Sequence, residues 1–338
     1  MSVAMAYLTV IIVWTTTPLG VTWSSETVSP TLAIFSRMVL AAGLGWGLFR
    51  MSGGSVSWKR SAVQKYLSAD VGIVLAMYAT YQGAGLIPSG LISVIYGLSP
   101  MISALFGQWL SDEEALPAYR WVACIISLFG LLTIFGQGLV LSSEALVGVL
   151  WLLLAVTLFS LSGVLVKRST HQNGFVEQTV GSLICSVPLL AVIFGMEVLK
   201  GYVLNGSAVT IEGMTAAVDA MSVKSLSAIL YLATMGSLVG FMCYFYVLSK
   251  MSASKVALVT LITPVMALTV GHLVNDEVVS GMTILGTALI LLSLVLFNWG
   301  ASIRRWIRLY GSDQSSAKKE PRQTLDDNSK AKAEALIS

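Results

Sequence analysis

Charged residues are scarce in this chain. Asp, Glu, Lys and Arg together make up 11% of its 338 residues, whereas hydrophobic residues make up 56%. Soluble domains carry roughly 25% charged residues, so this composition excludes an ordinary soluble domain. The net formal charge is only +3, and we expect a lipid bilayer, not a nucleic acid, to be the main partner.

Cysteine and histidine are also few, at three and two residues. Cys124, Cys185 and Cys243 lie in apolar runs and lack the Cys-x-x-Cys and mixed Cys/His spacings of metal sites, so the simplest interpretation is three small buried hydrophobes. The chain has no HExxH motif, and its two histidines are far apart. An intramembrane enzyme would need a nucleophile and base, paired carboxylates or metal ligands at membrane depth. We therefore expect no enzyme, no cofactor and no metal.

What the chain has is long apolar runs. A membrane helix needs about 20 mostly apolar residues, and these runs are continuous, unlike the short alternating strands of a membrane barrel. The sequence predicts an all-α integral membrane protein with ten transmembrane helices. The runs are Val3–Leu19, Pro30–Phe49, Tyr66–Leu86, Ser89–Leu110, Ala118–Phe135, Leu146–Val166, Phe175–Met196, Leu226–Leu248, Ser252–Val274 and Val279–Asn298.

The distribution of Lys and Arg predicts the orientation. Cytoplasmic connections are enriched in these residues. If both termini are cytoplasmic, the inner connections hold Arg50, Lys59, Arg60, Lys65, Arg120, Lys167, Arg168, Lys250 and Lys255, and the outer ones hold only Lys200 and Lys224. We therefore expect a multi-pass protein of the cytoplasmic membrane with both ends inside. Val3–Leu19 lacks a basic leader and a cleavage site, and we interpret it as the first span.

One stretch of the chain occurs twice. Residues 88–136 align without a gap on residues 252–300, at an offset of 164. The shared positions are Pro100/Pro264, Gly107/Gly271, Asp112/Asp276, Glu113/Glu277 and Gly136/Gly300. The copies lie five spans apart, so they cross the membrane in opposite directions. The sequence thus predicts two inverted five-helix repeats, 3–136 and 146–300, with a substrate site between them, and a basic, disordered cytoplasmic tail, 301–338.

The repeated prolines, Pro100 and Pro264, interrupt their runs at equivalent positions. Proline removes a backbone donor and bends a helix. The mirrored placement favours a pair of hinges beside a cavity, and the alternative is two packing kinks.

Two charged residues lie in or near the spans. Arg37 is the only basic residue well inside a run, and a charge there is costly. It either attracts a carboxylate solute or an acid such as Glu277, or anchors the helix at the outer interface. Asp70 is expected near the inner end of its span, in contact with water. The apparent lack of mid-span carboxylates argues against a proton/cation antiporter.

His272 and Glu277 lie together near an outer helix end. Histidine titrates near physiological pH, so both are candidates for proton coupling. The alternatives are a satisfied helix-end histidine and a carboxylate that caps the following helix.

Aromatic and small polar residues gather inside a few spans. Tyr78, Tyr81 and Gln82 share one helix face by their spacing. Such faces suit a mainly apolar pocket with a few polar anchors, although they are also typical of helix packing. The candidate cavity residues are Trp14, Thr16, Arg37, Tyr78, Tyr81, Gln82, Tyr96, Ser160, Tyr244 and Thr260.

Several of these residues match a known pattern. Its motifs are Trp14, Arg37, Ile87-Pro88-Ser89-Gly90, Ser99-Pro100, Asp112-Glu113, Ser252-Ala253-Ser254, Thr263-Pro264, Gly271, Glu277 and Gly286. With these motifs, residues 3 to 300 resemble the ten-helix EamA-type carriers of the drug/metabolite transporter superfamily. The resemblance implies a carrier that moves a small metabolite, often outward, by alternating access.

The expected function is therefore secondary transport of a small molecule, most simply export of an amino acid or a similar neutral, zwitterionic or carboxylate solute. A proton or a counter-solute is a candidate coupling partner. The alternatives are a multidrug or xenobiotic efflux carrier, a non-transporting membrane subunit and an intramembrane enzyme. A phosphate-sugar carrier would need clustered Lys and Arg, and only Arg37 is present in a span.

Overall fold

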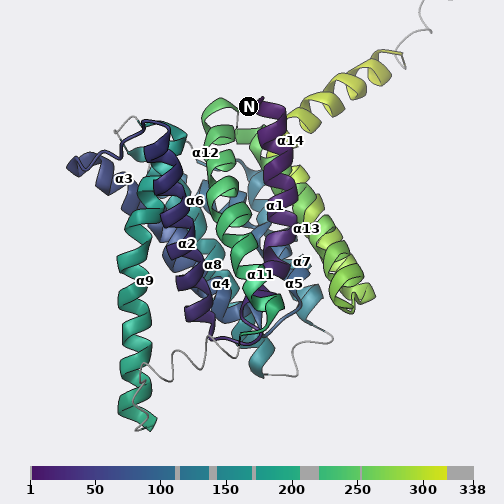
Figure 1. Cartoon of the computed structure of the whole chain (residues 1–338). Helices are drawn as coiled ribbons and strands as arrows, with labels where there is room; N and C mark the ends of the chain where they lie inside the picture. Colours follow the sequence, from purple (N-terminus) through teal and green to yellow (C-terminus); the bar gives the residue numbers. More distant parts are fainter. Residues whose placement is uncertain are drawn as a thin grey trace, which may run out of the picture.

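The computed structural model describes residues 2–110, 115–136, 143–169, 173–205, 221–251 and 253–317. Within these ranges the chain is helical and contains no strand, as the composition predicted (Figure 1). Asp112, Glu113, His171 and the segment 318–338 lie outside the described residues.

Ten helical segments cross the bundle, and three of them are built from more than one piece. The single helices are α1 (Val3–Ser24), α2 (Pro30–Met51), α7 (Ala118–Phe135), α8 (Ser143–Arg168), α9 (Phe175–Asn205), α13 (Ala253–Asn275) and α14 (Gly281–Ala317). The first composite segment consists of α3 (Arg60–Asp70), η1 (Val71–Ala76) and α4 (Met77–Ala84). The second consists of α5 (Ser89–Tyr96) and α6 (Ser99–Leu110), and the third consists of α11 (Val223–Tyr231), η2 (Leu232–Val239) and α12 (Gly240–Lys250). We number these crossing segments as spans 1 to 10 in chain order.

Eight of the spans are long and apolar enough to cross a membrane by length and composition alone. Span 3, residues 60–84, is not among the eight. Span 9 is not among them either, because only its part Val259–Asn275 counts as an apolar helix, and this part is shorter than 18 residues. These two spans lie inside the same bundle as the others (Figure 1).

The two π-helical segments, η1 and η2, occupy equivalent places in the halves of the chain. Adding the repeat offset of 164 to η1 gives residues 235–240, which overlap η2, Leu232–Val239. A π-helix is rare and is frequent at functional sites. Sequence reasoning gave no sign of either segment.

The two repeated prolines have different effects on their helices. Span 4 is broken at Gly97 and Leu98, directly before Ser99-Pro100. Pro264 lies inside α13, which continues through it. The structure therefore has one interruption and one continuous helix at positions that the sequence predicted to be alike.

The extents of two helices differ from the predicted runs. α9 continues to Asn205, well beyond Met196, and α14 continues to Ala317, beyond the expected end near Asn298. α14 thus extends through residues 301–317 of the segment 301–338, which the sequence predicted to be a disordered tail.

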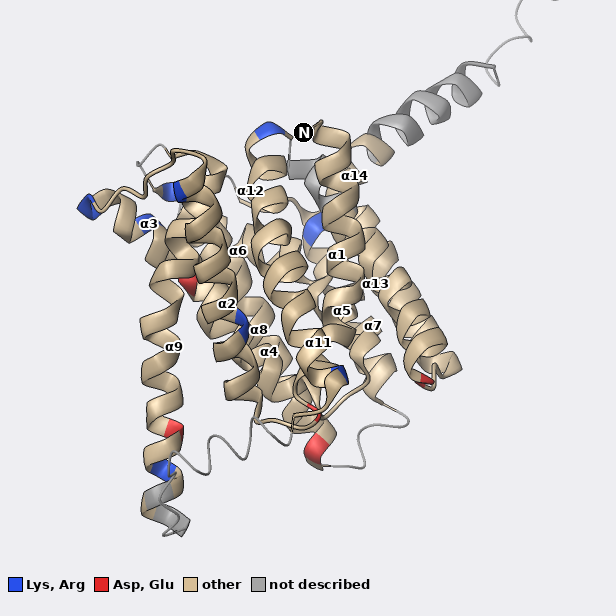
Figure 2. Cartoon of the chain, viewed as in Figure 1, with Lys and Arg blue, Asp and Glu red and all other residues tan. Residues whose placement is uncertain are grey.

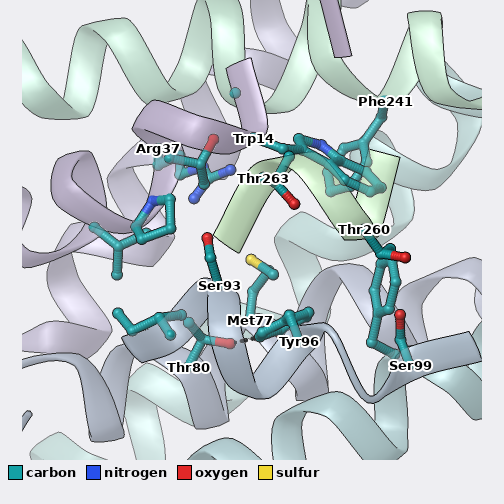
Figure 3. Close-up of a pocket in the computed structure, with 16 residues that line it drawn as sticks. Trp14, Arg37, Met77, Thr80, Ser93, Tyr96, Ser99, Phe241, Thr260 and Thr263 are labelled. Carbon is teal, nitrogen blue, oxygen red and sulfur yellow. Dashed lines mark hydrogen bonds between the residues drawn. The ribbon is translucent and has the colours of Figure 1, made fainter. Parts of the chain in front are cut away.

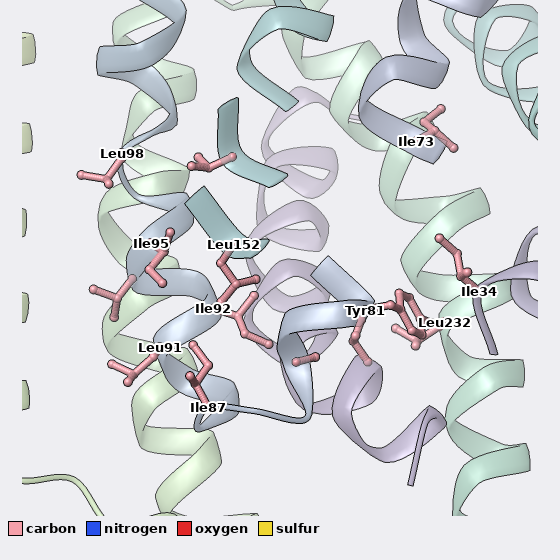
Figure 4. Close-up of a cluster of buried hydrophobic side chains, with 14 of the residues drawn as sticks. Ile34, Ile73, Tyr81, Ile87, Leu91, Ile92, Ile95, Leu98, Leu152 and Leu232 are labelled. Atoms are coloured by element: carbon pink, nitrogen blue, oxygen red, sulfur yellow. The ribbon is translucent and has the colours of Figure 1, made fainter. Parts of the chain in front are cut away.

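The core is a cluster of aliphatic side chains contributed by most of the spans. Figure 4 shows part of it, where Ile92 and Ile95 of span 4 lie near Leu152 of α8. α7 and α14 pack closely because Gly130 and Gly286 face each other. A Cβ atom added to Gly286 would lie 2.5 Å from the Gly130 carbonyl oxygen.

The most extensive helix contacts join the same partners in both halves. Three pairs join equivalent spans of the two halves: span 2 packs on span 7, span 4 on span 9 and span 5 on span 10. Two further contacts occur once in each half of the pattern. Span 3 packs on span 6 and, equivalently, span 8 packs on span 1; span 1 packs on span 9 and, equivalently, span 6 packs on span 4. Exchanging spans 1–5 for spans 6–10 leaves this set of pairs unchanged.

The bundle has two ends of different character. We call the end that holds the start of α1 proximal, and the end that holds the turns 85–88 and 276–280 distal. Figure 2 shows Lys and Arg mostly at the proximal end and acidic residues mostly at the distal end. In the part of the chain that the structure describes, the only ion pair is Lys224–Glu26, at the distal end.

Candidate functional site

A cavity lies in the middle of the bundle, between spans from both halves (Figure 3). It encloses about 730 Å³ of space free of protein atoms, its mouth included. The wall is formed by Trp14, Thr17, Pro18, Val21, Arg37, Met77, Thr80, Ile92, Ser93, Tyr96, Ser99, Phe159, Gly236, Phe241, Thr260 and Thr263.

Arg37 supplies the only charged group among the described residues that line the cavity. Its side chain is 1% exposed, and Nε donates to the Ser237 hydroxyl at 2.8 Å. Within the described residues, no carboxylate lies within ion-pair distance of it, and one terminal nitrogen has no hydrogen-bond partner. A buried guanidinium with a free donor has the charge and the hydrogen-bonding capacity to bind an anion.

Helix η2 gives Arg37 its position. Gly236 and Ser237 lie in this π-helical segment, and a Cβ atom added to Gly236 would lie 3.2 Å from an Arg37 terminal nitrogen. The absence of a side chain at Gly236 thus leaves room for the guanidinium, and Ser237 orients it. The sequence signal for Arg37 was its charge in an apolar run; nothing in the sequence indicated its two partners.

Neutral polar groups line the opposite wall. The Thr80 hydroxyl donates to the Ala76 carbonyl at 2.8 Å and lies 2.7 Å from the Tyr96 hydroxyl. Because Thr80 has only one proton to give, Tyr96 is the donor in that second bond. Ser160 lies behind this wall and donates to the Ser99 carbonyl at 3.2 Å, next to the break before Pro100.

Aromatic rings separate this cavity from a second hollow nearer the proximal end. The centroid of Trp14 lies 5.0 Å from that of Tyr244 and 6.0 Å from that of Phe159, and Tyr96 lies 5.6 Å from Phe159. The second hollow is lined by Ala69, Gly72, Ile73, Phe159, Ser162, Gly163, Val166, Phe241, Tyr244, Phe245 and Leu248. Phe159 and Phe241 line both spaces, so movement of these rings would join them.

The structure brings only some of the predicted residues together at the cavity. Trp14, Arg37, Tyr96 and Thr260 line it, and Tyr244 lines the second hollow. Thr16 lies 2.5 Å from the Tyr231 hydroxyl, and Tyr81 is buried with its hydroxyl near Ser24. These two, with Ser160, do not line either space.

Tyr78 and Gln82 belong to a different polar group, nearer the distal end. The carboxylate of Glu197 on α9 accepts from Thr31 at 2.7 Å and from Tyr78 at 3.1 Å, while Gln82 donates to Thr31 at 3.4 Å. The shared face of Tyr78, Tyr81 and Gln82 thus turns away from the cavity, because α4 packs against α2 as well as α8.

Sequence reasoning missed several wall residues. Phe159 and Phe241 gave no signal, because a Phe in an apolar run is ordinary for lipid contact. Nothing in the sequence distinguishes Met77 and Ile92 from other apolar residues of the spans either. Thr80 was one polar residue among many in the spans, and only the packing of span 3 against span 4 turns it inward.

The distal end of the bundle is closed by hydrogen bonds between the halves. The Glu277 carboxylate accepts from the backbone N–H groups of Ser89 at 3.0 Å and Gly90 at 3.2 Å, at the start of α5. Asn275 donates to the same carboxylate at 3.0 Å and accepts from the Trp23 indole at 2.8 Å. We call the contact of Glu277 with Ser89 and Gly90 the distal latch. An anion at a helix N-terminus is stabilised by the free N–H groups and the helix dipole.

The distal latch bears on two predicted roles. Glu277 was expected either to couple protons or to cap the following helix, and the helix that it caps is α5, from the other half. His272 does not contact its side chain: the ring Nδ1 lies 2.9 Å from the Glu277 backbone carbonyl. The roles of both residues in coupling stay predictions.

Asp70 differs from its prediction. It was expected in contact with water, but its side chain is 2% exposed and both carboxylate oxygens lack a hydrogen-bond partner. That expectation was wrong because α3 begins at Arg60, not near Tyr66, so Asp70 lies ten residues inside the span and packs toward α8 and α9. The statement that the spans lack buried carboxylates was wrong for the same reason.

Part of the chain is similar in sequence to known transporters. Residues 146–299 match the EamA-like transporter family. A chloroplastic WAT1-related protein of Arabidopsis thaliana is 27% identical over 226 residues, covering 64% of this chain and 50% of that protein. A probable amino-acid metabolite efflux pump of Escherichia coli is 23% identical over 222 residues, covering 66% of this chain and 71% of that protein. The family match in the second half of the chain and these relatives support membership in the drug/metabolite transporter superfamily.

A solved crystal structure supports the fold of this drug/metabolite transporter. It aligns with a TM-score of 0.58 at 17% identity and covers 87% of this chain and 96% of the other. The chain spans only half the length of the Arabidopsis relative. The family match and the names of these relatives support a membrane transporter and make enzymatic activity less favoured.

Proposed function

We propose that this transporter exports an amino acid or a similar small carboxylate solute by alternating access, with the solute carboxylate bound to Arg37. One observation carries the proposal: a guanidinium buried in a mid-bundle cavity, with an unpaired terminal nitrogen and without a carboxylate partner among the described side chains. A charge at mid-membrane costs about 2.5–3.5 kcal/mol on insertion scales, so its retention there favours a role in binding.

The repeat supports the mechanism. Two inverted halves, 3–136 and 146–300, would exchange roles when the carrier turns from one side of the membrane to the other. The unchanged set of helix pairs and the equivalent places of η1 and η2 support this arrangement. Pro100 and Pro264 are the proposed hinges, since each directly follows a residue of the cavity wall, Ser99 or Thr263.

The distal latch supports a conformation that is closed on the distal side. By the repeat offset, Ser89, Gly90 and Glu277 correspond to Ala253, Ser254 and Glu113. The same contact between Glu113 and the start of α13 would close the proximal side in the opposite conformation. Because Lys and Arg gather proximally (Figure 2), we assign the proximal end and both termini to the cytoplasm of a cell membrane.

Transport by purified protein in liposomes tests the function. Radiolabelled amino acids and the matching amino-acid amides are compared, because an amide lacks the anionic carboxylate but keeps its size. We expect the wild type to move amino acids faster than amides. Arg37→Gln should lose about ten- to hundredfold of that preference, since hydrogen bonds to a charged group are worth about 1.5–3 kcal/mol.

Gly236→Ala is a matched control in that experiment. It crowds the Arg37 guanidinium without removing its charge, so its loss of preference should be smaller than that of Arg37→Gln. Equal loss of amide and amino-acid transport in Arg37→Gln would contradict carboxylate binding and would indicate a structural arginine.

Efflux of apolar xenobiotics is the second candidate. It is favoured by the aromatic wall of Trp14, Tyr96, Phe159 and Phe241 around the cavity. This alternative predicts that transport of uncharged aromatic compounds survives Arg37→Gln and falls with Phe159→Ala. A membrane subunit without transport would move neither class of solute.

A further inference from the structure

Asp70 ends α3, directly before the π-helical segment η1. Its carboxyl group lies inside a membrane span, is 2% exposed and has no hydrogen-bond partner for either oxygen. An ionised carboxylate without a partner costs several kcal/mol in such surroundings. Asp70 therefore carries a proton in this conformation.

The other acids of the interior are bonded. Glu177 accepts from the Tyr66 hydroxyl at 2.8 Å and from the Ser57 N–H at 3.2 Å. Glu197 accepts from Thr31 and Tyr78, and Glu277 forms the distal latch. Asp70 thus differs from Glu177, Glu197 and Glu277, whose carboxylate oxygens accept hydrogen bonds from other parts of the protein.

The helices around Asp70 bring no cation to it. Among the described residues, α9 places the Cys185 thiol near enough for an electrostatic interaction with Asp70, and its Glu177 is bonded to Tyr66. The charged residues of α8 are Glu144, Lys167 and Arg168, at its two ends. On α3 itself, Lys65 donates to Asn173 at 2.7 Å. On α4, Tyr78 is bonded to Glu197.

Chain neighbours of Asp70, but not Asp70 itself, line a space through which a proton could reach it. Ala69, Gly72 and Ile73 line the second hollow, toward the proximal end. The helix is loosened here, because η1 departs from α-helical hydrogen bonding and the Ser162 hydroxyl donates to the carbonyls of Ser68 and Ala69 at 2.9 and 3.2 Å. Release of the proton would require a change at η1 that turns the Asp70 carboxyl group from its buried position toward this hollow.

We propose that Asp70 is a proton-binding site that takes up a proton in one conformation and releases it in the other, and so couples export of the solute to entry of protons. This coupling rests on the transport function proposed above. The step itself is only protonation and deprotonation of one carboxyl group, and its only ligand is the proton.

Infrared difference spectroscopy of the full-length protein in detergent tests proton binding without any solute. At neutral pH we expect the C=O absorption of a protonated carboxylic acid, and Asp70→Asn should lack it. Transfer to D2O should shift this absorption within minutes, because a coupling site must exchange its proton. Glu197→Gln is the control, since Glu197 is a bonded acid, and it should keep the absorption.

Two infrared results would overturn the proposal. One is that Asp70→Asn, eluting as a single folded species, shows the same absorption as the wild type. The other is an absorption that depends on Asp70 but does not shift in D2O, which would mean a permanently buried neutral acid.

A transport measurement then tests coupling. In liposomes, an imposed gradient of one pH unit should change steady-state accumulation of a zwitterionic amino acid about tenfold, for one proton exchanged per solute. Asp70→Asn should keep exchange of labelled for unlabelled solute but lose the gradient effect, and Asp70→Glu should keep both. An equal gradient effect in Asp70→Asn and wild type would overturn coupling. If no amino acid moves, the proposed function fails, while the infrared result decides the proton site by itself.

Discussion

The distal latch offers the sharpest prediction of conformational change. Glu277→Gln keeps the size of the side chain but removes its charge and one of its two acceptor oxygens. The wild-type carboxylate accepts from Ser89 and Gly90, one backbone N–H to each oxygen. The variant therefore loses one of these two bonds and the favourable charge at the start of α5.

The size of the effect follows from these contacts. A hydrogen bond to a charged group is worth about 1.5–3 kcal/mol and a neutral one about 0.5–1.5 kcal/mol, and a charge at a helix terminus adds about 0.3–1 kcal/mol. The loss is then about 2 kcal/mol, or about a 30-fold increase in the ratio of distally open to distally closed protein.

Pulsed electron paramagnetic resonance measures that ratio as a distance distribution. Spin labels at Gly85→Cys and Val278→Cys report on the two turns that the latch joins, in a protein whose three native cysteines are replaced by Ala. Gly85 has open space around its Cβ position, and Val278 is 86% exposed, so neither label disturbs the latch. We expect Glu277→Gln to add a population at longer distance.

Glu26→Gln provides the matched control at the same end of the bundle. It breaks the exposed pair of Glu26 with Lys224, which is worth about 0–1 kcal/mol, and should leave the distances nearly unchanged. Unchanged distances in folded Glu277→Gln protein would refute the latch. Equal opening in both variants would also refute it, because any loosening of the distal end would then suffice.

Three further predictions concern hinges, packing and the arginine site. Pro100→Ala and Pro264→Ala should each slow transport turnover more than they weaken solute binding, and loss of binding alone would contradict hinges. Gly286→Ala should destabilise the bundle by about 1–3 kcal/mol in thermal unfolding through overpacking against Gly130 and Ile134. Gly195→Ala, where the new methyl group meets nothing, should not, and equal losses would contradict this packing. Ser237→Ala should weaken amino-acid binding less than Arg37→Gln does, because it removes one orienting bond and no charge.

The helical membrane bundle itself could be predicted from the sequence. Apolar runs of about 20 residues and few charges leave a helical membrane protein as the simple solution. The starts and ends of helices were less predictable. α3 begins six residues before the predicted run because residues 60–65, four of which are polar, are helical. This difference moved Asp70 from the surface to the interior.

The cavity could be predicted only in part, since its walls depend on how each helix is rotated. Arg37 and Trp14 were found because such residues are rare in apolar runs. Tyr78 and Gln82 share a helix face, but packing of α4 against α2 turns that face toward Glu197. Phe159 and Phe241 cannot be told from lipid-facing residues in a sequence, and the π-helical turns that place Gly236 and Ser237 beside Arg37 have no known sequence signal here.

The proposed alternating access rests on two halves that cross the membrane in opposite directions. Single cysteines at 114 and 278, one repeat offset apart, test this directly in intact cells with a membrane-impermeant maleimide. Position 278 should be labelled from outside, and position 114 only after the membrane is made permeable. Labelling of both positions from the same side would contradict the inverted repeat and, with it, the proposed mechanism.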